Sequence, residues 1–141
     1  MIYSNYYDKV QNAAVLSQEG ENGQAIKEYL DAIELAPADE DKLEPLFALG
    51  LEFKQENPDD ALIYLEQCSK LAKTFDTDSF YYCYHYNAEK EIGDIYMNEK
   101  RFPKALLHFK KAYKDIKKYD DDKQSEKYLN DMIKLMEKKG A

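Results

Sequence analysis

The chain has 141 residues, of which 44% are hydrophobic and 34% are charged, and its formal net charge is −8. A chain of this length can bury a single core without a disulfide or a metal ion to stabilise it. Its longest apolar run, residues 46–51, is far shorter than the roughly 20 residues of a transmembrane helix, which excludes a membrane-spanning protein. The chain has only two cysteines, and its N-terminal residues lack the basic and apolar segments of a secretion signal. These features predict a cytoplasmic protein.

Apolar residues recur at helical spacing along the chain, and no alternating period-two stretch of useful length interrupts them. The chain is therefore expected to be all-α, with seven helices. In chain order, their ranges are 3–19, 24–36, 41–55, 58–74, 79–98, 103–119 and 123–138. Polar residues suited to N-terminal caps precede three of the helices: Asn57 before Pro58, the segment 76–79, and the aspartates 120–122.

Charge is distributed unevenly between the two halves of the chain. Residues 1–70 carry 5 Lys against 15 Asp and Glu, a net charge of −10, whereas residues 71–141 have a net charge of +2. The acidic half argues against a general nucleic-acid binder, because it repels phosphates. Residues 100–118 are the exception, since Asp115 is their one acid. This segment is either the solvated face of the sixth helix or a patch for an acidic partner, such as the acidic half of another copy.

The helices repeat a small–large–small pattern along the chain. Its first occurrence is Ala25, Tyr29 and Ala32, and it recurs 36 and then 44 residues later. The recurring residues are Ala61, Leu65 and Cys68, and then Ala105, Phe109 and Ala112. The preceding helices repeat as well, with Ala13, Gly50 and Gly93 at offsets of 37 and 43, so that both series span 80 residues. We infer three copies of one helix–turn–helix unit, followed by a capping helix.

The pattern has a mechanical cause. A small residue near the start of the second helix lets it approach the first helix closely, and Gly50 and Gly93 remove a side chain at the crossing. The large residue then fills the space between the helices, and the second small residue admits the next unit. Each copy buries its apolar face only by stacking on a neighbour.

This pattern resembles the tetratricopeptide repeat family over about residues 6–119. The third copy carries Ile92-Gly93-x-x-Tyr96, followed by Phe102, Ala105, Phe109 and Ala112; the second carries Leu49-Gly50-x-x-Phe53 with Ala61; the first carries Ala25-x3-Tyr29-x2-Ala32-x4-Pro37. The resemblance implies an α-solenoid of three helix pairs, at about residues 6–37, 43–74 and 79–119, plus a C-terminal capping helix at about 123–139. We expect one domain over residues 1–141.

In this family, the first helices of successive repeats line a concave groove that holds an extended peptide or a helix of a partner protein. The resemblance places nine residues of this chain there: Tyr7, Val10, Ala14, Phe47, Leu51, Lys54, Lys90, Asp94 and Met97. It therefore implies a non-catalytic adaptor for another protein. Two alternatives stay open. One is self-association through an exposed aromatic end formed by Tyr3, Tyr6 and Tyr7, and the other is a small chaperone for one dedicated client.

Other chemistry finds little support in the sequence. One subfamily grips the carboxylates of chaperone tails, but the matching positions here are Val10, Ala14, Ala48, Asn87 and Glu91, which cannot neutralise them. His85 and Glu89 have the spacing of a helical metal pair, yet two ligands make an incomplete shell. His85 and His108 lie on separate helices without a catalytic motif. We expect no enzyme activity, metal ion or cofactor, and no nucleic-acid or membrane partner.

Overall fold

The computed structural model describes residues 2–75, 80–119 and 122–140, with side chains from Ser4 onward. Its elements are α1 (Ile2–Gln18), α2 (Asn22–Leu35), the 3-10 turn η1 (Asp39–Lys42), α3 (Leu43–Phe53), α4 (Pro58–Lys73), α5 (Tyr82–Asn98), α6 (Phe102–Tyr119) and α7 (Lys123–Lys138). These described residues contain no strand. The predicted all-α class of repeated helix pairs is confirmed, and most helix ends lie within two residues of the predicted ones.

The third helix differs from its prediction because of a proline. An α-helix starting at Asp41 would need the N–H of residue 45 to donate to the Asp41 carbonyl, and Pro45 has none. The chain instead forms η1 before α3, and the Asp41 carbonyl accepts a hydrogen bond from the Tyr6 hydroxyl at 2.5 Å. The fifth helix, predicted from residue 79, begins at Tyr82. The cap predicted at residues 76–79 lies outside the described residues.

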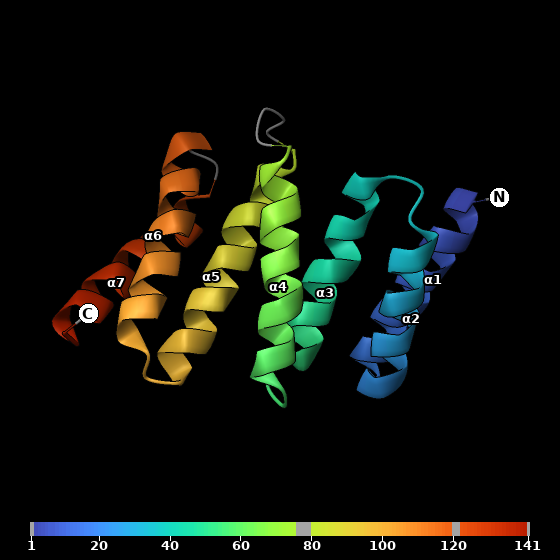
Figure 1. Cartoon of the computed structure of the whole chain (residues 1–141), viewed down its shortest axis with the longest axis horizontal. Coiled ribbons are helices and arrows are strands. Elements are labelled where there is room, and N and C mark those ends of the chain that lie inside the picture. Colours follow the sequence, from blue (N-terminus) through green and yellow to red (C-terminus); the bar gives the residue numbers. More distant parts are fainter. Residues whose placement is uncertain (1, 76–79, 120–121, 141) are drawn as a thin grey trace. The chain divides into compact units, whose positions relative to one another are not determined.

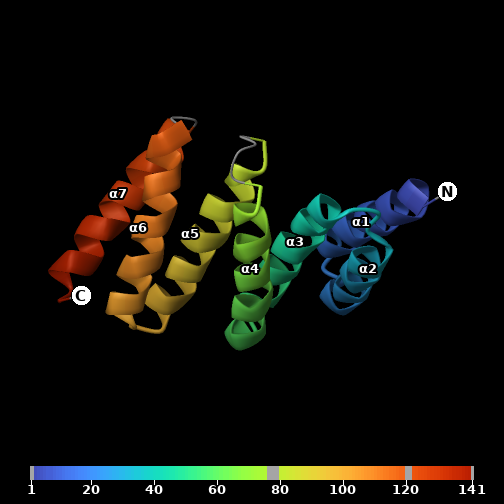
Figure 2. The ribbon, with the colours of Figure 1, turned by 45° about the horizontal axis from the view of Figure 1, so that its top comes forward.

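The chain divides into two compact units, residues 1–71 and 72–141. Unit 1 holds α1, α2, α3 and most of α4. One of its core clusters joins Ala13, Ala25, Tyr29 and Leu49, so that α1, α2 and α3 share a core. Unit 2 holds α5, α6 and α7, in which α5 and α6 run antiparallel and α7 packs beside α6 (Figures 1 and 2). That residues 1–141 form one domain stays a prediction.

The small–large–small pattern forms the core in both units. Its small members are fully buried, and of its large members Leu65 and Phe109 are fully buried and Tyr29 is 7% exposed. A Cβ atom added at Gly50 would overlap the Leu65 side chain, and one added at Gly93 would lie 2.6 Å from Cε1 of Phe109. The predicted close crossing of the paired helices at these two glycines is therefore confirmed.

The self-association alternative requires a correction at its aromatic end. Tyr6 is only 2% exposed, and it packs in a second core cluster with Val10 and Ala32. Its hydroxyl is bonded to Asp41, which orients the ring inward. Tyr7 is 52% exposed, and its ring meets that of Tyr6 edge-on at 5.2 Å. The side chain of Tyr3 lies outside the described part. Tyr6 therefore belongs to the core and not to an exposed aromatic surface.

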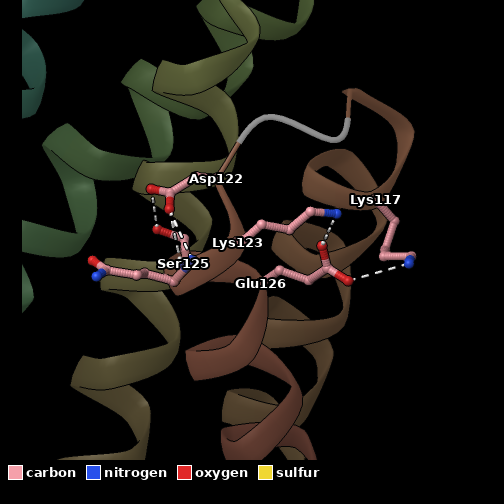
Figure 3. A network of polar contacts seen from close by, with 6 residues as sticks. Lys117, Asp122, Lys123, Ser125 and Glu126 are labelled. Atoms are coloured by element: carbon pink, nitrogen blue, oxygen red, sulfur yellow. Dashed lines mark hydrogen bonds and ion pairs between the residues drawn. The ribbon is translucent and has the colours of Figure 1, made fainter.

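Two of the predicted helix caps are present. Asn57 Oδ1 accepts a hydrogen bond from the Asp60 N–H at 3.4 Å at the start of α4. At the start of α7, Asp122 Oδ1 accepts from the N–H groups of Gln124 and Ser125, each at 3.1 Å (Figure 3). The Ser125 hydroxyl donates to the other Asp122 oxygen at 2.7 Å. These hydrogen bonds, led by the Ser125 side chain, hold the pKa of Asp122 below its ordinary value.

Replacing Asp122 with Ala is expected to lower the free energy of unfolding by about 1 kcal/mol, because two N–H groups of the first turn lose their acceptor. Asp122→Asn keeps an acceptor and should retain most of the stability. A carboxylate with a lowered folded-state pKa stabilises the protein above about pH 4, its unfolded value, and the effect is lost as pH falls through the folded pKa. Urea denaturation at neutral and at acidic pH measures the stability lost in Asp122→Ala and its dependence on pH. Equal stabilities of wild type and Asp122→Ala at neutral pH would contradict the prediction.

Candidate peptide-binding surface

The six predicted groove residues of unit 1 have different environments. On α1, Tyr7 and Ala14 are exposed, whereas Val10 is 7% exposed and packs against Tyr6 and Ala32. On α3, Leu51 is 44% exposed, and Phe47 and Lys54 are half-buried. Ala13 of α1 and Leu49 of α3 belong to one core cluster, so the first helices of the first two repeats pack against a shared core. The surface of unit 1 therefore offers exposed apolar side chains on rigid helices.

The three predicted groove residues of unit 2 lie on α5, and a residue of α7 joins them. The Tyr128 hydroxyl donates a hydrogen bond of 2.6 Å to Asp94 Oδ1. The Lys90 ammonium lies 5.3 Å from the centroid of the Tyr128 ring, within range of a cation–π interaction. Asp94 is 9% exposed, while Lys90 and Met97 are half-buried. Tyr128 thus contacts both charged groups, and the Lys90 ammonium also lies 3.7 Å from Oε2 of Glu91.

Tyr128 keeps its proton in this environment. Burial is the main cause that raises its pKa far above the ordinary value for tyrosine, and the hydrogen bond to Asp94 adds to the shift. The phenol therefore acts as a donor, and the Asp94 carboxylate is its acceptor. This contribution of the capping helix was missed in the sequence, where Asp94 and Tyr128 stand 34 positions apart. The surface of unit 2 thus presents the half-buried Lys90 cation, whereas the Asp94 carboxylate is buried and bonded to the Tyr128 hydroxyl.

A second polar feature joins α5 to α6. His108 Nδ1 lies 2.5 Å from Oε2 of Glu89, whose side chain is only 7% exposed, and His85 Nδ1 contacts Asp115 Oδ2. The two candidate metal ligands of α5 are thus each paired with a residue of α6. Among the described residues, no group of three or more His, Cys, Asp or Glu side chains is placed to hold a metal ion.

The partners of His85 and Glu89 were not predicted, although the sequence carries a usable signal. Gly93 and Phe109 mark the point where α5 and α6 cross. Moving eight residues back along α5 and six forward along antiparallel α6 leads to His85 and Asp115. The crossing therefore sets a register that brings these two residues together. This register does not account for the contact between Glu89 and His108, because both residues precede the crossing residue of their own helix in an antiparallel pair.

Residues 13–39 match the family model described as tetratricopeptide repeat. The matched stretch contains the buried residues Ala25, Tyr29 and Ala32, so the predicted resemblance is confirmed. A tetratricopeptide repeat generally mediates protein–protein interaction. No curated protein matches the chain. No helix in the described ranges is both long and apolar enough to cross a membrane.

Proposed function

We propose that this protein is a non-catalytic adaptor that binds a peptide or a helix of a partner protein. The binding surface would be formed by the first helix of each repeat. The observation that carries the proposal is the tetratricopeptide repeat at residues 13–39, together with Leu51 and Tyr7. Both are large apolar side chains left 44% and 52% exposed at family groove positions. Covering such side chains with a partner removes apolar surface from water, which favours binding.

Unit 2 offers a charged contact of its own at Lys90. Lys90 is already held beside the Tyr128 ring and within 3.7 Å of a Glu91 oxygen, so binding costs little side-chain entropy at this position. A partner with complementary charges is favoured over one with charges of the same sign. The dedicated-client chaperone suggested by the sequence would use the same surface, and it differs from an adaptor in the number of partners.

Replacing Leu51 with Asp is expected to weaken peptide binding by about tenfold or more, because a carboxylate replaces an exposed apolar contact of the proposed surface. The assay is selection of binders from a random peptide display library, followed by titration of the selected peptides. Phe47 is half-buried and contacts other residues, so Leu51→Asp is the cleaner single substitution. Circular dichroism checks that the variant is folded.

The matched control is Leu30→Asp. Leu30 is 39% exposed, close to the 44% of Leu51, but it lies on α2, a second helix of its repeat. The same substitution is thus made at similar exposure outside the proposed surface. Binding should stay at the wild-type level in this variant. Equal binding by wild type and Leu51→Asp, or equal losses in the two Leu→Asp variants, would refute the proposed surface.

A further inference from the structure

Two second helices, α4 and α6, present an exposed aliphatic residue at equivalent positions. The offset of 44 that relates the buried pattern of the second and third repeats also relates Ile63 to Leu107. Ile63 is 51% exposed and Leu107 is 53% exposed, while their neighbours Leu65 and Phe109 are fully buried. Each helix therefore turns one aliphatic side chain outward on the side opposite to its core residues.

The charges around these two residues are opposite. On α6, Lys110 and Lys111 follow Leu107, and at the same repeat positions α4 carries Glu66 and Gln67. One turn earlier, Lys104 of α6 corresponds to Asp60 of α4. Lys70 of α4 keeps the sign of its equivalent, Lys114. Lys73 of α4 likewise keeps the sign of its equivalent, Lys117, so the outer face of α4 is acidic only from Asp59 to Gln67, whereas that of α6 is basic throughout.

The charges on both faces are available for a partner. Lys110, Lys111 and Lys114 are exposed and form no ion pair with a described residue. Asp115, the one acid of α6, turns inward to His85 and does not neutralise them. On α4, Glu66 and Asp59 are likewise exposed and pair with no described cation. Among the described residues of unit 2, Lys110, Lys111 and Lys114 therefore have no counter-charge, whereas Lys117 pairs with Glu126.

We propose that the outer face of α6 in one copy of this chain binds the outer face of α4 in a second copy. Leu107 would pack against Ile63, and Lys110 and Lys111 would pair with Glu66. The two faces differ, so the contact is heterologous, with each copy using one face for each neighbour. A nucleic acid is disfavoured as the occupant, because the net charge of −8 repels it and it has no aliphatic counterpart for Leu107.

A charge-swap experiment tests the contact. One variant, Lys110→Glu/Lys111→Glu, makes the face of α6 acidic, and a second, Glu66→Lys/Gln67→Lys, makes the face of α4 basic. Each variant alone sets like charges against each other. An equimolar mixture again brings opposite charges together at both contacts. The matched control for the first variant is Lys134→Glu/Lys138→Glu, which makes the same change in net charge on exposed lysines of α7.

Sedimentation velocity at concentrations up to about 300 µM gives the outcome, since contacts built on exposed charges are weak. The wild type and the α7 control should exceed the monomer mass of 16.5 kDa at about 20 mM salt, and return to it at about 500 mM, where charges are screened. Each charge-swapped variant alone should associate at least about tenfold more weakly, and their mixture should recover wild-type association.

Three results would overturn the proposal: a wild type that stays monomeric at low salt, variants that associate as the wild type does, or a mixture that fails to recover. Retention of a monomeric wild type on an oligonucleotide or on anionic vesicles, lost in Lys110→Glu/Lys111→Glu, would overturn it too, since the face of α6 would then serve another polyanion. Leu51→Asp should leave self-association unchanged. The peptide-binding proposal can therefore fail without affecting this one, and the reverse.

Discussion

Replacing His108 with Leu is expected to lower the free energy of unfolding by about 3 kcal/mol, because it removes a close partner of a buried carboxylate. Glu89 is 5% exposed, and His108 lies 2.5 Å from one of its oxygens. Leu fills much of the volume of the imidazole, which stacks on Tyr96 at 5.5 Å between ring centroids, so a cavity contributes little. Urea denaturation followed by far-UV circular dichroism measures the loss.

Two further variants show whether the buried charge causes this loss. Glu89→Leu/His108→Leu removes both partners and should recover most of the stability, since replacing a buried polar pair by apolar residues is often neutral. His85→Leu breaks the pair with Asp115, whose side chain is 21% exposed, so water solvates the freed carboxylate and the loss should be about 1 kcal/mol. A double variant no more stable than His108→Leu would show that packing, and not charge, determines the effect.

The fold was predictable because its information is local and repeated. The period of apolar residues located every helix, and the recurrence of Ala25, Ala61 and Ala105 located the crossings, since a buried small residue is needed wherever two helices approach. The error at the start of α3 was avoidable. Pro45 cannot donate to Asp41, and this alone forbids an α-helical turn there.

The polar contacts of the surface were harder to predict from the sequence, because they depend on the register between helices. The hydrogen bond from Tyr128 to Asp94 joins α7 to α5, and the spacing of residues within one helix gives no information about it. The burial of Val10 illustrates the same limit. Family positions place it with the groove residues, but the Tyr6 ring and Ala32 pack against it in this chain. Which side of a helix a neighbour covers is decided by packing and not by period.

Replacing Gly93 with Ala is expected to lower the free energy of unfolding by about 2 kcal/mol, because the added Cβ overlaps a rigid ring. Overpacking a core costs about 1–3 kcal/mol, and the better helix propensity of alanine offsets about 1 kcal/mol of that cost. The Cβ would lie 2.6 Å and 2.7 Å from two ring atoms of Phe109, which is fully buried. The cost should therefore fall at the upper end of its range.

Gly23→Ala is the matched control, because a Cβ there meets no atom within 4 Å and Gly23 lies in the first turn of α2. This variant should be as stable as the wild type or up to about 1 kcal/mol more stable, since alanine favours the helix and nothing opposes it. The two Gly→Ala variants should therefore shift the urea midpoint in opposite directions. A Gly93→Ala protein as stable as Gly23→Ala would mean that α5 and α6 do not cross as closely as the contact with Phe109 requires, and the mechanical reason for the repeated pattern would be wrong.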